Sequence, residues 1–472
     1  MRLVLPFLIT IPTIVLASTM NPRESLLEIL SKPNAHVDPE LRGEFESILK
    51  EYHESKQDDG APSNSDDILF RIGSSVFGIE FDEEKPKGPI PDYPPMNDGS
   101  VIVPFEYMRG FMKDVFMSYG IPEDRAEICS DVLIESDLRG IDSHGLGRLK
   151  PIYCDRMDQG ILQPNPPIDI VRETDTTALV DGNLGLGLYI GPYCMDLAIQ
   201  KAKKHGVGFV VAQRSTHYGI AGYYATMATD AGCIGWTGTN ARPSIAPTFG
   251  VEPMMGTNPL CFGIPTDEEF PFVIDCATSI NQRGKIERYG REGIDTPKGV
   301  VVDHEGLERT DTKGILEDMV MGKCALNPVG GAGDKTAGYK GYSWALVVEL
   351  LSTAFQSGPF GADISGVDRK TGKKIPMPLG HYFLAIDIEA LCPLDTFKKN
   401  AGKLIRAIRA SKKSPRGPGR IWTAGEPEND ARVYRTGKGG MRVPVSLQNN
   451  MVDLREKQAG LKEKYEKFPW EE

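Results

Sequence analysis

Residues 207–239 read VGFVVAQRSTHYGIAGYYATMATDAGCIGWTGT, and this stretch decides the predicted fold class. It opens with a β-rich run at residues 207–213 and closes with another at residues 234–239. Between them, residues 220–231 show a helical pattern. Short β-rich runs that alternate with helices are typical of α/β proteins, so we predict an α/β region here.

The same alternation continues on both sides of this stretch. Short apolar β-rich runs again alternate with segments whose apolar residues recur at helical spacing. One α/β body is therefore expected from about Val101 onward. Its further strands are predicted at residues 101–104, 178–181, 272–275 and 382–388, and its further helices at residues 105–119, 124–140, 188–205, 342–357 and 398–411.

The two ends of the chain differ from this body. Residues 20–100 are predicted to be an N-terminal extension that ends in a linker, because residues 83–97 are rich in proline and charge. Residues 446–472 are predicted to be a charged C-terminal tail with a peripheral helix at residues 453–467. The apolar run within residues 1–19 leaves two interpretations open, a cleaved secretory signal peptide or an upstream extension. The expected location is therefore cytoplasmic or, with a true signal, the secretory pathway.

Composition excludes several classes of partner. The formal net charge of −11 disfavours nucleic acid or an anionic membrane surface. The eight cysteines are scattered without a C-x-x-C pair, which indicates mostly buried, reduced thiols rather than a zinc site or a disulfide framework. Beyond the N-terminal run, no stretch of about 18 apolar residues exists, so no other membrane helix is expected.

Common site motifs are missing from the sequence. No G-x-G-x-x-G lies between a predicted strand and a predicted helix, so the dinucleotide fingerprint is absent. Residues 330–335, GGAGDK, resemble a phosphate loop but lack its G-x-x-x-x-G-K-[ST] spacing. There is no H-E-x-x-H and no G-x-S-x-G, so neither hydrolase template applies and no metal site is expected.

His144 lies in the segment RGIDSHGLGR, residues 139–148. Three glycines and two arginines surround it. Glycine allows a backbone to approach a ligand closely, and arginine presents a planar fork to a carboxylate. These residue types indicate a binding site for a carboxylate. The alternative interpretation is a loop that ends a helix and exposes its charges.

His217 lies directly after the β-rich run that opens the quoted stretch. A polar histidine at the end of a strand, before a helix, is in a usual position for a site residue of an α/β protein. Histidine suits proton exchange with an alcohol or a carbonyl near neutral pH. The alternative interpretation is a histidine that caps the helix or belongs to the core.

Four more clusters of small and polar residues each follow an apolar stretch. Small residues allow close backbone contact with a ligand, and lysine can bind a phosphate. Taken singly, each cluster is more typical of a turn than of a site. The clusters are TNA at residues 239–241, GTNP at residues 256–259, DCATS at residues 275–279 and GYKGY at residues 338–342.

Taken together, these segments resemble the malate/L-lactate dehydrogenase family, also called type-2 lactate dehydrogenase-like, with its sulfolactate and ureidoglycolate dehydrogenases. The resemblance is colinear and spans about residues 101–442. It rests on the combination of residues 139–148, 215–224, 256–262, 275–285 and 340–342.

The resemblance implies an α/β fold whose NAD(P)-binding domain is not of the Rossmann type. It implies a mixed, mostly antiparallel sheet in a cofactor domain at about residues 178–345, within a catalytic region at residues 101–445. A helical substrate-side domain and a homodimer are implied as well. The implied activity is hydride transfer between NAD or NADP and a small 2-hydroxy acid or 2-oxo acid, such as malate or lactate.

The family pattern also implies residues on the substrate side. Its acid–base histidine corresponds to His217. Its Ser-His-Gly segment corresponds to Ser143, His144 and Gly145. Arg148 is then expected to anchor the substrate carboxylate, with His144 beside it.

A second set of residues is implied for the cofactor. The sequence departs from the family at two of these places, with Cys276 where methionine is usual and Ser343 where glycine is usual. Arg242 adds a positive charge to a loop on the cofactor side, and a 2′-phosphate would suit it. The implied cofactor-binding residues are Ala241, Asp275, Cys276, Ala277 and Lys340, and Asn240 and Asn258 are added because they adjoin these segments.

Two other functions stay open at this point. The same hydride chemistry would serve a reductase of cyclic imino acids. The long extension and the two departures also fit a catalytically silent binding protein. A comparison of keto acid with imine substrates separates the first alternative, and cofactor titration separates the second.

Overall fold

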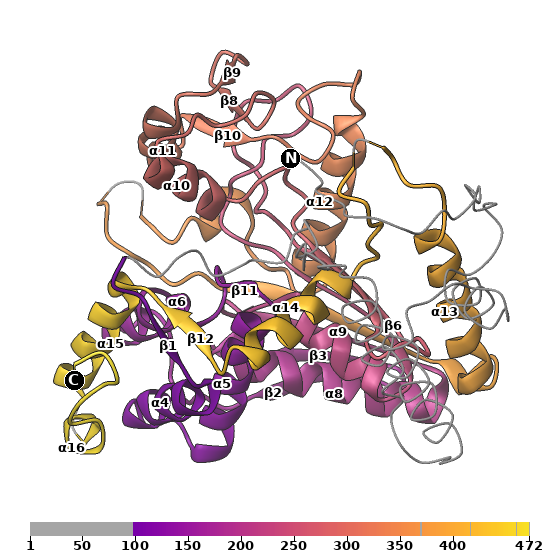
Figure 1. Ribbon diagram of the computed structural model, residues 1–472, viewed down its shortest axis with the longest axis horizontal. Helices are drawn as coiled ribbons and strands as arrows, with labels where there is room; N and C mark the ends of the chain where they lie inside the picture. The colour runs from indigo at the N-terminus through magenta and orange to yellow at the C-terminus, as the bar shows by residue number, and fades with distance from the viewer. Residues whose placement is uncertain (1–97, 369–370, 416, 459, 472) are drawn as a thin grey trace, which may run out of the picture. The chain divides into compact units, whose positions relative to one another are not determined.

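The computed structural model describes residues 98–368, 371–415, 417–458 and 460–471 (Figure 1). The predicted signal peptide and almost all of the predicted N-terminal extension lie outside these residues. None of the described helices is long and apolar enough to span a membrane. All eight cysteines are free thiols, and most of them are buried.

A seven-stranded sheet forms the centre of the described part of the chain. Its β3–β4 pair is parallel and its other pairs are antiparallel, which confirms the predicted mixed, mostly antiparallel sheet. The strand order is β2-β3-β4-β11-β5-β6-β7. The strands are β2 (Asp169–Glu173), β3 (Thr177–Asp181), β4 (Val207–Ser215), β5 (Cys233–Thr239), β6 (Leu260–Ile264), β7 (Phe272–Cys276) and β11 (Leu379–Asp387).

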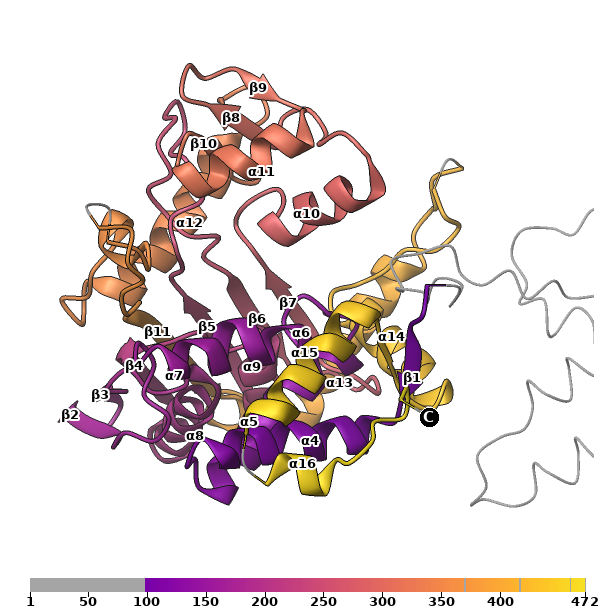
Figure 2. The same cartoon turned by 90° about the vertical axis from the view of Figure 1, so that its left-hand side faces the viewer.

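Helices cover both faces of this sheet because its central strands are apolar on both sides. On β4, Val210 and Ala212 belong to the core cluster that includes side chains of α8 (Gly187–His205) and α9 (Ala221–Asp230). Val211 points the other way and packs with Val348 of α12 (Gly338–Thr353). Figure 2 shows α8 and α9 on one side of the sheet and α12 on the other.

A helical layer packs beyond α8 and contains both ends of the described chain. It is built on α4 (Phe105–Ser118) and α5 (Glu123–Leu138), which the sequence predicted to within a few residues. The short strand β1 (Val101–Val103) pairs antiparallel with β12 (Met441–Val443). This pairing joins the two ends of the described chain beside these helices.

The prediction of one peripheral helix at residues 453–467 is wrong. The segment instead forms the end of α15 (Val445–Lys457) and the short helix α16 (Leu461–Lys464). Leu454 and Phe468 are buried, and the Phe468 ring lies 5.3 Å from that of Phe111 on α4. The many charged residues hid this apolar face, whose members are widely spaced along the chain.

The prediction for α12 was displaced along the chain. The structure begins this helix at Gly338 and ends it at Thr353, whereas the sequence predicted residues 342–357. The glycines looked like a turn, but Gly341 is needed for close packing: a Cβ there would lie 2.1 Å from the carbonyl oxygen of Val329. Lys340 therefore lies in the first turn of α12.

The remaining elements surround the sheet and were mostly not predicted. A second, three-stranded sheet consists of β8 (Val301–Asp303), β9 (Glu308–Arg309) and β10 (Cys324–Leu326). The other helical segments are α6 (Leu146–Arg148), a π-helical turn (Leu149–Cys154), α7 (Asp155–Asp158), α10 (Arg283–Glu292), α11 (Thr312–Met321), 3-10 turns at Gly361–Ile364 and Ile388–Ala390, α13 (Leu394–Arg409) and α14 (Glu426–Gly437).

Candidate active site

The end of β4 carries the chain out of the sheet toward the predicted acid–base residue. The register of β4 against β11 shifts between Ala212 and Ser215, which is a β-bulge. Within it, Arg214 has a positive φ of 47°, an uncommon conformation for a residue other than glycine. Asp181 holds the bulge by accepting a hydrogen bond of 2.9 Å from Arg214 Nε. His217 follows two residues after the strand ends.

The imidazole of His217 is held at one nitrogen and open at the other. The Tyr153 hydroxyl oxygen lies 2.6 Å from His217 Nδ1, and the backbone N–H of Gly219 approaches the same nitrogen at 3.3 Å. No hydrogen bond to Nε2 is found within the described residues, so this nitrogen is available to a ligand. The ring of His144 stacks beside it at a centroid distance of 5.6 Å.

Burial and positive charge keep both histidines neutral. Burial lowers the pKa of His217 well below 6.5, and His144, Arg148 and Arg156 lower it further. Burial, with a contribution from Arg148, also lowers the pKa of His144 to about 4. In the neutral tautomer whose proton is on Nδ1, that N–H donates a hydrogen bond to the Tyr153 hydroxyl oxygen, and the Nε2 lone pair of His217 can act as a base.

The segment from Ser143 to Arg148 turns beside these rings. The Ser143 hydroxyl lies 2.8 Å from His144 Nδ1, and Arg148 Nε donates to the carbonyl oxygen of Ser143. Position 145 requires glycine, since a Cβ there would lie 2.2 Å from the carboxylate of Asp137. The structure thus brings all four predicted substrate-side neighbours of His217 into one turn.

A polar chain connects this side of the site to the predicted cofactor side. Arg139 donates from Nη1 to the carbonyl oxygen of Gly222 at 3.2 Å. The backbone N–H of Gly222 in turn donates to Asp275 Oδ2 at 2.7 Å. Burial raises the pKa of Asp275 to about 6, although this N–H and the Arg139 charge oppose the rise. The helix that follows His217 is therefore tied to the Asp-Cys-Ala triplet.

The predicted cofactor segments lie against one another. A Cβ at Gly256 would lie 2.5 Å from the carbonyl oxygen of Ala241, so the two loops touch backbone to backbone. The carbonyl oxygen of Thr257 accepts from the backbone N–H of Thr278, directly after the triplet, at 2.9 Å. The carbonyl oxygen of Thr278 accepts from Val329, which contacts α12. Ala241, Asp275, Cys276, Ala277 and Lys340 thus belong to adjoining segments.

Side-chain exposure divides the predicted cofactor residues into two kinds. Cys276 and Lys340 are exposed, and Ala241 and Ala277 are partly exposed, so all four can meet a ligand. Asn240 and Asn258 are instead 1% and 0% exposed. Their Nδ2 atoms donate to the two carboxylate oxygens of Glu349 on α12, at 3.3 Å and 2.7 Å.

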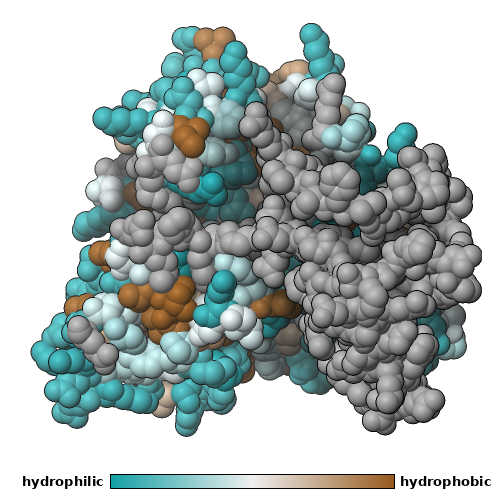
Figure 3. Space-filling model, in the orientation of Figure 1, coloured by the Kyte–Doolittle hydropathy of each residue, from teal (hydrophilic) through white to brown (hydrophobic). Residues whose placement is uncertain are grey.

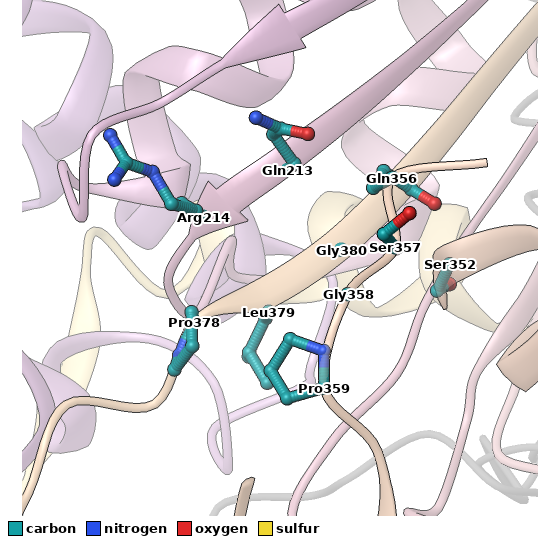
Figure 4. A pocket seen from close by; sticks show the side chains of 10 residues that line it. All are labelled: Gln213, Arg214, Ser352, Gln356, Ser357, Gly358, Pro359, Pro378, Leu379 and Gly380. Atoms are coloured by element: carbon teal, nitrogen blue, oxygen red, sulfur yellow. The ribbon is translucent and has the colours of Figure 1, made fainter. Parts of the chain in front are cut away.

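A cavity of about 190 Å³ lies beside the β4 bulge, between the end of α12 and the start of β11 (Figure 4). It is smaller than the roughly 300–1,000 Å³ of typical ligand pockets. None of the predicted site residues lines it. Its lining is Gln213, Arg214, Ser352, Gln356, Ser357, Gly358, Pro359, Pro378, Leu379 and Gly380.

Sequence reasoning missed four residues that shape the site. Tyr153 sits in the π-helical turn, where Pro151 obscured the helical pattern, and Arg156 follows it on α7. His381 on β11 is fully buried, and its Nε2 donates to the carbonyl oxygen of Thr216. Glu349 was hidden in an apolar helix. For Arg156 alone the sequence held a signal, because it lies eight residues after Arg148 on the same run of helical turns. The other three residues had none.

Comparison with known proteins agrees with the colinear set of segments. A family model described as malate/L-lactate dehydrogenase matches residues 103–452. The malate dehydrogenase of Pyrococcus horikoshii is 40% identical over 331 residues, which cover 70% of this chain and 88% of that one. The L-sulfolactate dehydrogenase of Methanocaldococcus jannaschii is 36% identical over 341 residues, covering 72% of this chain and 92% of that one.

A solved structure shows the same relationship. The crystal structure of malate dehydrogenase from Entamoeba histolytica superposes with a TM-score of 0.72 and 41% sequence identity, covering 76% of this chain and 98% of that one. The described residues thus form a mixed α/β protein with a mostly antiparallel sheet, as in these dehydrogenases. The chain belongs to the malate/L-lactate dehydrogenase family.

Proposed function

We propose that this protein is an NAD(P)-dependent oxidoreductase that interconverts a small 2-hydroxy acid and the corresponding 2-oxo acid. One observation carries the proposal: a neutral His217 with an open Nε2 lies near the charges of Arg148 and Arg156, and the backbone N–H of Gly222, five residues further on, bonds to Asp275. A base, a cationic anchor and the predicted cofactor triplet are thus joined in one site. Relatives named malate, sulfolactate and L-lactate dehydrogenase support this reading.

In this proposal, His217 moves the substrate proton. Its Nε2 accepts the hydroxyl proton during oxidation and returns it to the carbonyl oxygen during reduction. Tyr153 orients the ring through Nδ1 and stays protonated, because burial raises the pKa of its hydroxyl well above 10. His144 stacks on the ring and excludes water from one side of it.

The substrate carboxylate is assigned to the arginines. Arg148 is partly exposed and presents a guanidinium next to His217, which suits a two-pronged contact with a carboxylate. Arg156 adds a second positive charge near the same ring. Ser143 and the backbone at Gly145 complete the proposed substrate-side turn.

The adjoining cofactor segments fit a nicotinamide dinucleotide. The loops at Ala241 and Gly256 contact each other through their backbones, and the exposed Lys340 provides a cation for a phosphate. The bound nicotinamide would supply the hydride acceptor. The mostly antiparallel sheet and the missing glycine fingerprint support a binding domain that is not of the Rossmann type.

A panel assay tests the function directly. Malate, L-lactate, sulfolactate and other 2-hydroxy acids are each mixed with NAD⁺ or NADP⁺, and the absorbance of the reduced nicotinamide is followed. We expect turnover of at least one acid, and the two cofactors are compared with that acid. Turnover of a cyclic imino acid with NADH or NADPH, and of no hydroxy acid, would make the protein an imine reductase. Failure to bind either reduced cofactor would leave a silent binding protein.

We also propose a homodimer. Large apolar side chains of α12 and the segment after it are about half exposed, and aromatic residues are enriched at protein interfaces. Apolar side chains also gather around α6 and β12 on the face shown in Figure 3. Light scattering on the purified protein measures the assembly, and a monomer contradicts the proposal. The exposed residues of α12 and its continuation are Tyr339, Trp344, Leu350, Phe355 and Phe360.

A further inference from the structure

Glu349 is a buried carboxylate held by neutral groups. It is 6% exposed on α12 and, within the described residues, forms no ion pair with a lysine or arginine. Burying a charge without a counter-ion is costly, so hydrogen bonds must compensate for it. Burial raises the pKa of Glu349, while donors from Asn258, Asn240 and Gly256 lower it.

The amide donors of the two asparagines are taken up by protein groups, and the Oδ1 of Asn258, which has no hydrogen-bond partner within the described residues, is buried. Asn240 Nδ2 donates to Glu349 Oε1, while its Oδ1 accepts from the backbone N–H of Gly380 at 3.0 Å. Asn258 Nδ2 donates to Glu349 Oε2 at 2.7 Å and to the carbonyl oxygen of Ala345 at 3.0 Å. Both side chains are buried, so their amides face the protein and not a bound dinucleotide.

The backbone of each asparagine continues into a cofactor segment. Asn240 precedes Ala241 directly. The carbonyl oxygen of Asn258 accepts from the Thr278 hydroxyl at 3.2 Å, one residue after the Asp-Cys-Ala triplet. Asn258 also has a positive φ of 37°, which the surrounding bonds must hold in place. Lys340 lies on the same helix as Glu349.

We propose that Glu349 is a positioning residue for the cofactor, and that Asn240 and Asn258 act through its carboxylate. This inference rests on the proposed function. The carboxylate joins the Ala241 loop, the Asp275–Ala277 segment and α12, so that their ligand-facing atoms keep one spacing. It deepens the assignment of the cofactor site without adding a group that touches the cofactor.

The variant Glu349→Gln tests the role of the two acceptor oxygens. A carboxylate accepts from both asparagines, whereas a glutamine offers one oxygen and one amide donor. Neither asparagine can rotate its side-chain amide by 180° without cost. Asn240 would lose its hydrogen bond from Gly380, and Asn258 would lose its hydrogen bond to Ala345. We expect the Kd for NADH or NADPH, measured by fluorescence titration without substrate, to rise roughly ten-fold. The KM for the hydroxy acid at saturating cofactor should change less than about two-fold.

A second substitution should rescue the first. In Glu349→Gln with Asn240→Asp, the glutamine amide donates to the new aspartate and its oxygen still accepts from Asn258. The other aspartate oxygen still accepts from Gly380. We expect the cofactor Kd of this double variant to return to within about three-fold of the wild-type value. If Asn240 contacted the cofactor with its own amide, Asn240→Asp would add a second defect instead.

Ser352→Ala is the matched control. Ser352 lies one turn further along α12 and is 1% exposed, and its hydroxyl has no hydrogen-bond partner in the part of the chain that the structure describes. Its loss should leave the cofactor Kd unchanged. An equal rise in Kd for Ser352→Ala and Glu349→Gln would show a general effect of α12 and overturn the inference.

The remaining outcomes also decide the matter. A wild-type Kd in folded Glu349→Gln overturns the positioning role but not the proposed function, which fails only if wild-type protein binds neither reduced cofactor. If Glu349→Gln does not fold, as judged by circular dichroism, Glu349→Asp replaces it. The shorter carboxylate cannot reach both asparagines, so its cofactor Kd should rise, and an unchanged Kd overturns the inference.

Discussion

The substrate side of this site relies on charged side chains, whereas the cofactor side relies on contacts between backbone segments. Around His217, partly exposed arginines supply positive charge and the histidine rings are held neutral. Around Ala241, the contacts are backbone against backbone, and the buried carboxylate of Glu349 is turned inward. A small anion can be bound by one or two nearby positive charges, whereas a long dinucleotide requires several segments at a fixed spacing.

This difference suggests that the two sides should fail in different ways. Loss of a charge on the substrate side should change proton transfer or the KM for the acid, and should leave cofactor affinity unaffected. Loss of the positioning carboxylate of Glu349 on the cofactor side should weaken cofactor binding and leave the KM for the acid nearly unchanged. The expected effects on the substrate side follow from the largest to the smallest.

Replacement of the base should have the largest effect. We expect His217→Asn to lower kcat for hydroxy-acid oxidation by about 10²–10⁴-fold, the usual contribution of one placed acid–base group. The Kd for reduced cofactor should stay near the wild-type value. His205→Asn is a suitable control, because His205 is exposed at the end of α8. A kcat close to wild type in His217→Asn would remove this residue from the mechanism.

Replacement of the carboxylate anchor should come next. Arg148→Lys keeps the charge but loses the planar fork. We expect the KM for the hydroxy acid to rise about ten-fold, since hydrogen bonds to charged groups are among the stronger ones. The change in kcat should be smaller than the change in KM. Steady-state kinetics at saturating cofactor measure both, and an unchanged KM would exclude Arg148 as the anchor.

Removal of the hydroxyl that orients the base should have a moderate effect. Tyr153→Phe deletes the 2.6 Å hydrogen bond to His217 Nδ1 and leaves the ring in place. The loss of one neutral hydrogen bond corresponds to about a five-fold fall in kcat. Phe116, whose ring contacts Tyr153, offers a control for packing through Phe116→Leu. Equal kcat values for Tyr153→Phe and wild type would show that the hydroxyl does not orient the base.

The smallest effect should appear only in the pH profile. Burial, with the charges of His144, Arg148 and Arg156, lowers the pKa of His217, so the neutral base persists at pH values below 6.5. Arg156→Gln removes one of these charges and raises the pKa. The acid limb of the kcat/KM profile for oxidation should therefore move to higher pH, with little change at alkaline pH. A shift to lower pH, or none, would contradict the assignment of this limb to His217.

Much of this architecture could be predicted because it depends on local pattern. The helices α5 and α8 and the strands β4 and β5 have clear periodicity and end at polar or glycine residues. His217 and His144 stood out as polar groups among glycines at an element's end. That they belong to one site was implied by the family resemblance, and periodicity alone did not show it.

What escaped prediction depends on contacts between distant segments. Glu349 is one acidic residue in an apolar helix, and its partners Asn240 and Asn258 lie about a hundred positions earlier. The apolar face of the C-terminal segment is spread over two short helices and a loop. The start of α12 was misplaced because glycines that permit close packing resemble glycines that make turns.

The bulge at the end of β4 has a consequence for chain length. Gly380 on β11 faces a stretch of β4 that contains more residues than a regular ladder would have. Deletion of one residue between Ala212 and Ser215 would have to straighten the strand or pull His217 back toward the sheet. A designer who wished to transplant this histidine to another scaffold would therefore have to move the irregular strand end, with Asp181, as a single module.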